Sequence, residues 1–180
     1  MELKLVFAGI GGQGVIFATK VVSHAAMARG ERVMASENHG MSQRGGSVQA
    51  HIKIGGSEAP LVRRGAADVL IAFDRAEAIR NLLFVRPGGR VFVNSMNGLD
   101  TAIANRLEEL GVAVHAIDAD ACARELGAPA VSSMVVLGLA AAHDGLGLSA
   151  DDLKQAVRAL GPAKAVELNV KALEMGAAKA

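Results

Sequence analysis

Residues 3–14 read LKLVFAGIGGQG, an apolar run that ends in glycines at positions 9, 11, 12 and 14. Residues 15–28 follow with apolar side chains at helical spacing, and Gly30 is placed to end that helix. A strand, a glycine turn and a helix in this order expose backbone N–H groups at the helix N-terminus, where an anion is stabilised. The sequence therefore predicts a Rossmann-like unit whose first turn is a candidate anion-binding site.

Strands and helices alternate along the rest of the chain. The expected strands are residues 32–36, 47–54, 68–73, 90–94 and 112–117, and the expected helices are residues 74–80, 101–110, 118–126, 130–143, one opened by a capping box at 149–152, and 163–175. Residues 87–89 are expected to form a turn. The pattern predicts one α/β domain over residues 1–180, a three-layer α/β/α sandwich around a mostly parallel sheet of about six strands.

One expected strand differs from the others in its pattern. Residues 47–54 alternate strictly between polar and apolar side chains, which is typical of a half-exposed strand. Buried parallel strands are instead apolar throughout. We therefore expect this strand to run antiparallel to its neighbours or to lie at an edge of the sheet.

Composition excludes several classes of function. The chain is 51% hydrophobic but only 3% aromatic, and its formal net charge is +1. Single-strand nucleic-acid binding relies on aromatic stacking and on a basic excess, so no nucleic-acid partner is expected. The longest apolar candidate, residues 133–142, is about half of the ~20 residues that a membrane span needs, so no membrane partner is expected. The single cysteine, together with an N-terminus that leads straight into the first expected strand without a signal-peptide pattern, gives the expectation of a cytoplasmic location.

Few residues suggest catalysis or metal binding. Cys122 is the only cysteine, so the chain can form neither an internal disulfide nor a four-thiolate iron–sulfur cluster from its own residues. The histidines lack metal-ligand spacing, and no metal site is expected. Ser42 and Ser47 have no recognisable base, and the acids at residues 74–77 are explained by the start of a helix. No catalytic residue is identified.

A second glycine-rich segment strengthens the significance of the first turn. Residues 37–48 read ENHGMSQRGGSV and follow the strand at 32–36, so both turns are expected near the same carboxyl edge of the sheet. Polar loops held open by glycine are more often functional than structural. Arg44 can hold a phosphate or carboxylate with a bidentate fork, and a solvated or interface-pairing arginine is the equally weighted alternative.

Dinucleotide binding is the alternative function at the first turn. Gly9, Gly11 and Gly14 fit the G-x-G-x-x-G pattern, and Glu37 stands where a ribose-binding acid is expected. The chain would then be a Rossmann-like nucleotide-binding regulatory module or an independent NAD(P)-dependent enzyme. The additional Gly12 and the absence of an evident acid–base set argue against this interpretation.

The two glycine-rich motifs, GGQGV at residues 11–15 and ENHGMSQRGGSV at 37–48, resemble the gamma-type domain of 2-oxoacid:ferredoxin oxidoreductases, and within that family the small beta subunit of the indolepyruvate enzymes. Similar segments at 51–55, 65–74 and 83–89 extend the resemblance over nearly the whole chain. The MSQRGG run is the more specific motif. The resemblance implies oxidative decarboxylation of an aryl 2-oxoacid with coenzyme A, with ferredoxin as electron acceptor.

The resemblance also implies a division of labour. In this family thiamine diphosphate, magnesium and the iron–sulfur clusters belong to a larger alpha subunit. The single cysteine and the lack of a Gly-Asp-Gly…Asn-Asn signature agree with that division, so the chain is expected to bind none of these groups alone, to be inactive alone and to reach ferredoxin through the complex.

Two roles stay open for the glycine-rich segments: holding the phosphates of coenzyme A at the subunit interface, or forming the interface that closes over the thiamine site. The residues expected to serve one of these roles are Gly11, Gly12, Gln13, Gly14, His39, Gln43, Arg44, Gly45 and Gly46.

Overall fold

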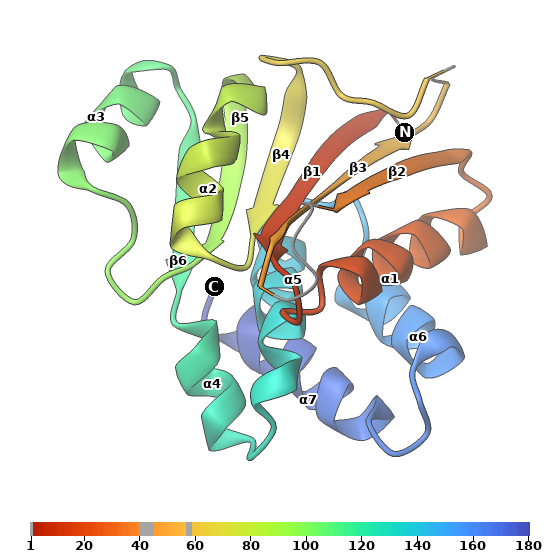
Figure 1. Cartoon of the computed structure of the whole chain (residues 1–180). Coiled ribbons are helices and arrows are strands. Elements are labelled where there is room, and N and C mark those ends of the chain that lie inside the picture. The colour runs from red at the N-terminus through yellow and green to blue at the C-terminus, as the bar shows by residue number, and fades with distance from the viewer. Residues whose placement is uncertain (1, 40–44, 57–58) are drawn as a thin grey trace.

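The computed structural model describes residues 2–39, 45–56 and 59–180, and within them one six-stranded sheet has the order β2-β3-β1-β4-β5-β6 (Figure 1). The strands are β1 (Leu3–Ile10), β2 (Val33–His39), β3 (Ser47–Ile54), β4 (Ala67–Ala72), β5 (Val85–Asn94) and β6 (Ala113–Ile117). Neighbours from β1 to β6 are parallel, whereas β3 is antiparallel to both β1 and β2. The alternating strand is therefore antiparallel, as one of the two expectations had it, and lies inside the sheet.

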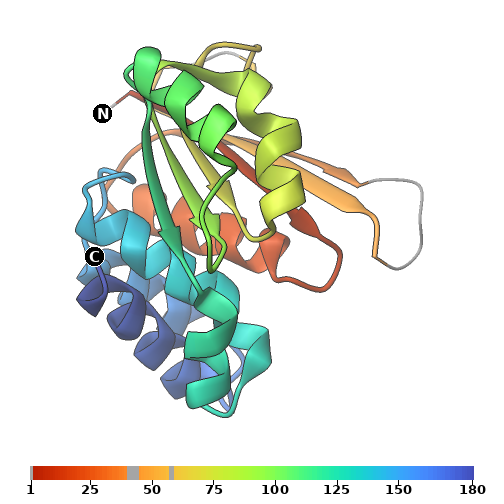
Figure 2. The ribbon, with the colours of Figure 1, turned by 90° about the vertical axis from the view of Figure 1, so that its left-hand side faces the viewer.

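Helices cover both faces of the sheet. They are α1 (Val15–Ala28), α2 (Arg75–Asn81), α3 (Thr101–Glu109), α4 (Ala119–Glu125), α5 (Ser132–Ala142), α6 (Ala150–Leu160) and α7 (Val166–Ala178), with 3₁₀ turns at Leu82–Phe84 and Pro129–Val131. One apolar cluster joins the sheet to α1, α4, α5, α6 and α7, and a smaller one joins the opposite face to α2 and α3. Figure 2 shows these two groups of helices on opposite sides of the sheet. These layers confirm the predicted α/β/α sandwich. No helix of the described part is long and apolar enough to cross a membrane.

Helix α5 is enclosed between the sheet and α7. Nine of its eleven residues are buried. A Cβ added to Gly138 in α5 would lie 2.0 Å from the carbonyl oxygen of Leu173, and one added to Gly176 in α7 would lie 1.9 Å from that of Val135. The two helix backbones are thus in direct contact, and this side of the sheet is two helices deep where α7 covers α5.

The predicted turn at Pro87–Gly89 was wrong as a separate element, because these residues belong to β5. The ladder with β4 passes from Val85 opposite Ala67 directly to Arg90 opposite Val69, so the intervening residues bulge out of register. The bulge explains why the local sequence has the composition of a turn. The predicted capping box is confirmed, since Ser149 and Asp152 exchange both hydrogen bonds at the start of α6.

Candidate functional site

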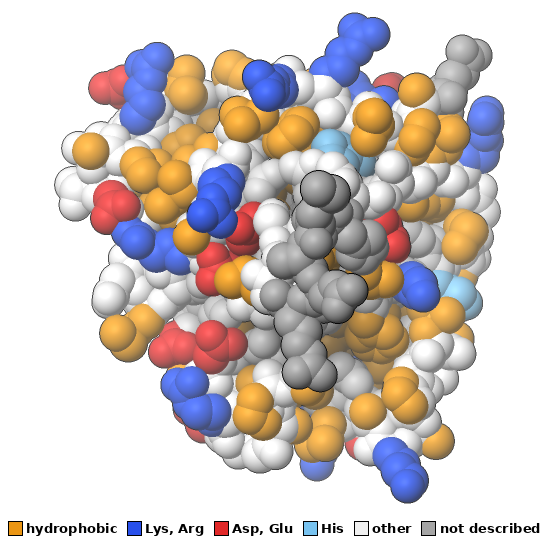
Figure 3. Space-filling view, in the orientation of Figure 1, with side chains coloured by type: hydrophobic (Ala, Val, Ile, Leu, Met, Phe, Trp, Pro, Cys, Tyr) orange, Lys and Arg blue, Asp and Glu red, His pale blue; other side chains and the backbone are white. Residues whose placement is uncertain are grey.

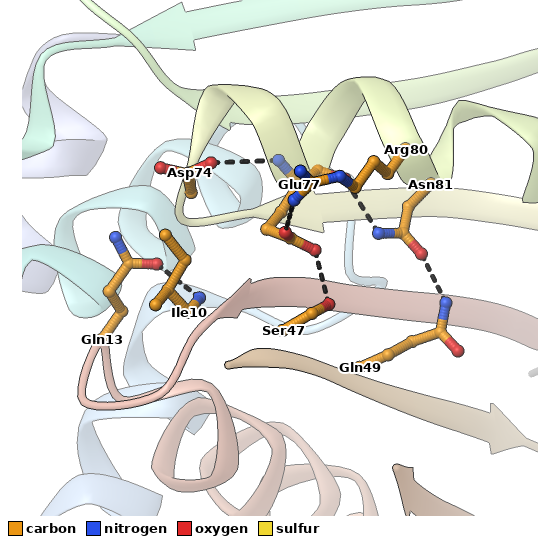
Figure 4. Close-up of polar contacts among 8 residues, drawn as sticks. All are labelled: Ile10, Gln13, Ser47, Gln49, Asp74, Glu77, Arg80 and Asn81. Atoms are coloured by element: carbon orange, nitrogen blue, oxygen red, sulfur yellow. Dashed lines mark hydrogen bonds and ion pairs between the residues drawn. The ribbon is translucent and has the colours of Figure 1, made fainter. Parts of the chain in front are cut away.

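The first glycine turn connects the end of β1 to α1 and is closed by Gln13. The backbone N–H of Ile10 donates to the Gln13 side-chain oxygen at 2.8 Å, and the Gln13 N–H donates to the Ile10 carbonyl oxygen at 3.0 Å (Figure 4). Gln13 is one of the predicted binding residues, and its side-chain oxygen is used in a hydrogen bond within the turn. Its closed geometry fixes the direction in which α1 starts.

The N-terminus of α1 has the features of an anion site. Gly14, the residue before the helix, is left-handed at φ 78°, and its carbonyl accepts the first intrahelical bond from Ala18 at 2.9 Å. The N–H groups of residues 15–17 precede that bond, no side chain of the described residues caps them, and the first turn contains no acid. Free donors and the positive end of the helix dipole together favour a phosphate or carboxylate at this point.

Gly14 also packs against the core. A Cβ at this position would lie 2.7 Å from the hydroxyl oxygen of Ser133 in α5, which is a buried side chain. Helix α5 therefore packs directly against the glycine turn. Ser133 could not be connected with the glycine turn from the sequence, because Gly14 and Ser133 lie in distant parts of the chain.

The two glycine-rich segments meet, as expected from the sequence. The N–H of Gly11 donates to the carbonyl oxygen of Gly46 at 2.9 Å. Gly45 and Gly46 lead into β3, and the backbone of His39, at the end of β2, pairs with Val48. The predicted binding residues Gln43 and Arg44 lie outside the described residues.

A pocket of about 290 Å³ opens beside this junction. Its walls are the glycine turn, the first turn of α1 and one side chain of β3: Ile10, Gly11, Gly12, Gly14, Val15, Ile16, Phe17 and Val48. Gly11, Gly12 and Gly14 are predicted binding residues, so the structure brings these three to one concave surface. Glycines on that wall let a ligand or a partner chain approach the backbone closely.

A polar seam lies between β3 and α2. It consists of Ser47, Gln49 and His51 of β3 with Glu77 and Asn81 of α2. Alternation along β3 turns its polar side chains toward α2 and its apolar ones toward α1. Ser47 donates to the Glu77 carboxylate at 2.6 Å, and Gln49 donates to the Asn81 side-chain oxygen (Figure 4). The expectation of a half-exposed strand was wrong for His51, which is only 3% exposed because α2 and the chain around residue 62 cover this face.

His51 occupies the inner end of the seam. The N–H of Val62 donates to its Nδ1 at 3.1 Å, so Nε2 carries the proton and donates to the Gln49 oxygen at 2.9 Å. Burial, assisted by the charge of Lys53, lowers the pKa of His51. The imidazole is therefore held neutral as a link between strand and loop.

Glu37 does not join the glycine turn. It lies on β2, with β3 inserted between β2 and β1, and lines a separate pocket of about 260 Å³ beside Thr19 and Lys20. In the dinucleotide-binding unit the acid-bearing strand lies next to the first strand. This topology separates Glu37 from the place that a ribose-binding acid would need.

Glu77 is the principal residue of the site that the sequence did not indicate. The acids at 74–77 were interpreted as helix-start residues, and Asp74 does cap α2 by accepting the Glu77 N–H at 3.0 Å. The Glu77 side chain instead turns into the seam and is 2% exposed. The polar alternation at 47–51 was the available signal, because buried polar side chains require polar partners.

Charges on the molecular surface are mixed in sign. On the face seen in Figure 3, acidic and basic side chains are interspersed. Across residues 2–39, 45–56 and 59–180, no three His, Cys, Asp or Glu side chains gather as metal ligands. The chemistry of the described site consequently rests on backbone donors, glycines and the polar seam.

Comparison with known proteins gives consistent matches over the full length. The family model described as pyruvate ferredoxin/flavodoxin oxidoreductase matches residues 4–179. Indolepyruvate oxidoreductase subunit IorB of Archaeoglobus fulgidus is 32% identical, with 98% of this chain and 94% of the relative aligned. The IorB subunit of Pyrococcus horikoshii is 34% identical over 97% of this chain and 94% of its own length. A crystal structure of the gamma subunit of keto/oxoacid ferredoxin oxidoreductase from Geobacter sulfurreducens has 27% identity and a TM-score of 0.76, covering 98% and 97% of the two chains.

Proposed function

Because the chain belongs to the pyruvate ferredoxin/flavodoxin oxidoreductase family, we propose that it is the small subunit of an indolepyruvate-type 2-oxoacid:ferredoxin oxidoreductase. The observation that carries this proposal is the match to indolepyruvate subunits over nearly the full length of both chains. The whole chain would act as one gamma-type domain in a cytoplasmic complex. Its larger partner would be the alpha subunit.

The proposed enzyme converts an aryl 2-oxoacid and coenzyme A to an acyl-CoA and carbon dioxide, and passes two electrons to ferredoxin. Thiamine diphosphate with magnesium, and the iron–sulfur clusters, would be held by the larger subunit. This chain's residues do not fit cluster ligation, since its single cysteine, Cys122, is buried in α4. The isolated chain is accordingly proposed to be inactive.

The chain's own contribution is proposed at the junction of the two glycine-rich segments. The free N–H groups at the start of α1 would hold a phosphate of coenzyme A, and Arg44 would add a charged fork to that contact. His39, Gln43, Gly45 and Gly46 would complete the contact from the second segment. The alternative, a surface that only docks the larger subunit, uses the same glycines for close backbone approach.

Substitution of Arg44 tests this assignment. Loss of a charge-assisted hydrogen bond costs ~1.5–3 kcal/mol, so Arg44→Lys should impair the affected step roughly ten- to a hundred-fold, and Arg44→Ala should impair it further. Steady-state kinetics of the reconstituted complex would show a raised KM for coenzyme A with normal assembly if Arg44 contacts the ligand. Weakened assembly would support the docking role, and wild-type activity and assembly of Arg44→Ala would refute both.

Hydrogen exchange on the reconstituted complex tests the ligand directly. Coenzyme A should slow exchange of the amides at residues 15–17, because these N–H groups at the start of α1 would face its phosphates. NADH is the control, and it should leave the same amides unchanged. Protection by NADH instead of coenzyme A would favour a dinucleotide site.

A further inference from the structure

Glu77 is a buried acid in the first turn of α2 whose carboxylate reaches beyond its own helix. Its carboxylate accepts the Ser47 hydroxyl at 2.6 Å and pairs with Arg80, whose side chain is 68% exposed. The cap of α2 is supplied by Asp74, so the helix does not need a second acid for capping. Burying a carboxylate is costly unless it is paired and hydrogen-bonded. Glu77 meets both conditions, because Arg80 in the same helix pairs with it and Ser47 of β3 donates a hydrogen bond to it.

The contact with Ser47 leads directly to the glycine junction. Ser47 follows Gly46 in the chain and pairs with Ile10, the last residue of β1, in the ladder. The carbonyl of Gly46 in turn accepts the N–H of Gly11. A continuous path therefore runs from the Glu77 carboxylate, through the Ser47 hydroxyl and one peptide unit, to the first glycine turn.

We infer that Glu77 is a positioning residue: by fixing Ser47, it holds the carbonyl of Gly46 on the amide of Gly11 and so sets the spacing of the two glycine-rich segments. The catalytic consequence of this inference rests on the proposed function. The geometric part, the spacing of the two glycine-rich segments, does not rest on it. Exchange of the Gly11 amide, which is bonded to Gly46, can be measured without any ligand.

Amide exchange of Gly11, followed by NMR on the full chain, tests the geometric part. Ser47→Ala removes the hydroxyl, and exchange of the Gly11 N–H should accelerate about tenfold or more, as expected when a hydrogen bond to a charged group is lost. Ser47→Thr keeps a hydroxyl and should restore slow exchange. Glu77→Gln keeps an acceptor for Ser47 but loses the charge, and should give an intermediate rate.

Ser149→Ala is the matched control, because it also removes a hydroxyl hydrogen bond, in the capping box of α6. It should lower the free energy of unfolding while leaving Gly11 exchange unchanged once rates are corrected for global unfolding. Equal Gly11 exchange in Ser47→Ala and wild type would overturn the inference. So would equal acceleration in Ser47→Ala and Ser149→Ala.

Kinetics of the reconstituted complex test the catalytic part. Ser47→Ala should raise the KM for coenzyme A about tenfold with kcat nearly unchanged at saturation, and Ser47→Thr should rescue it. Failure of coenzyme A to protect residues 15–17 in the wild-type complex would count against the proposed function, while the Gly11 measurement would still decide the positioning role. Protection in wild type with an unaltered KM in Ser47→Ala would overturn the catalytic part alone.

Discussion

Gly14 is under two constraints, a left-handed backbone and the nearby hydroxyl of Ser133. Gly14→Ala should therefore lower the free energy of unfolding by more than the ~1–2 kcal/mol that a left-handed backbone costs an L-residue, since the added Cβ also clashes. Urea unfolding of the full chain measures this loss. A loss of free energy above ~1–2 kcal/mol would indicate overlap with α5 in addition to backbone strain.

Gly12→Ala is the matched control, because its φ is 99° and no atom of the described residues lies within 4 Å of an added Cβ. It should show the backbone cost alone. In the double variant Gly14→Ala/Ser133→Ala the nearest contact becomes the Ser133 Cβ at 3.6 Å, an ordinary distance, so part of the stability lost in Gly14→Ala should return. Equal losses in Gly12→Ala and Gly14→Ala would show that Ser133 exerts no steric restriction.

Individual residues differ in how well the sequence indicated their roles. The glycines at 11, 12 and 14 were identifiable because a strand-to-helix turn needs them locally. Ser133 and Glu77 were not, because their partners, Gly14 and Ser47, come from distant parts of the chain. A polar side chain that acts through a tertiary contact has no local signature, and an acid at a helix start has an ordinary alternative explanation.

At the scale of elements, the contact between α5 and α7 depends on two glycines. Gly138→Ala and Gly176→Ala should each destabilise the fold by about 1–3 kcal/mol or more, the usual cost of overpacking, because the new methyl group meets a backbone carbonyl that cannot rotate away. Chemical denaturation measures the effect. Gly56→Ala is the control, since within the part of the chain that the structure describes no atom lies within 4 Å of its added Cβ. A loss no larger than that of Gly56→Ala would mean that the helices separate easily.

Strand β3 shows what a sequence pattern can predict about an element. Its alternation predicted either an antiparallel strand or an edge strand, because parallel strands buried on both faces are apolar throughout, and the first of these alternatives is confirmed. It gave the wrong environment for His51, since polar alternation equally suits a strand whose polar face is covered by a hydrogen-bonded helix. The partner that decides between these cases, α2, lies further along the chain.

At the scale of the molecule, two histidines should make stability depend on pH. Burial, with the nearby His143 and Arg90, lowers the pKa of His115, and burial with Lys53 lowers the pKa of His51. Above the ordinary value of 6.5 neither group contributes, because it is neutral in both folded and unfolded chains. Below it the unfolded chain binds protons more readily, so the free energy of unfolding should fall as pH drops from about 6.5 toward 5.

Urea unfolding at pH 5.5 and 7.5 checks this dependence. His115→Asn removes one titrating group, so the difference in free energy between the two pH values should shrink relative to wild type. Asp152 does not interfere, because its hydrogen bonds with Ser149 lower its pKa from 3.8 and its contribution is lost only in more acidic solution. An unchanged difference in His115→Asn would show that His115 is not responsible.

Local patterns predicted most elements and the layered architecture, but not the order of the strands. The insertion of β3 between β1 and β2 depends on long-range pairing, and this insertion removed Glu37 from the glycine turn. The meeting of the two glycine-rich segments was predictable because the carboxyl ends of parallel strands share an edge. The contacts that α2 makes with Ser47 and that α5 makes with Gly14 were not predictable, because they arise from packing between distant segments.

The enclosure of α5 by α7 has a consequence for synthesis on the ribosome. Helix α7 follows every other described element in the chain, so the most apolar helix lacks its cover until translation has passed residue 178. Exposed apolar surface of this kind is prone to aggregation, and chaperones shield it. The core of the nascent chain thus stays incomplete until α7 has been synthesised, and α7 is the element that ends this exposure of α5.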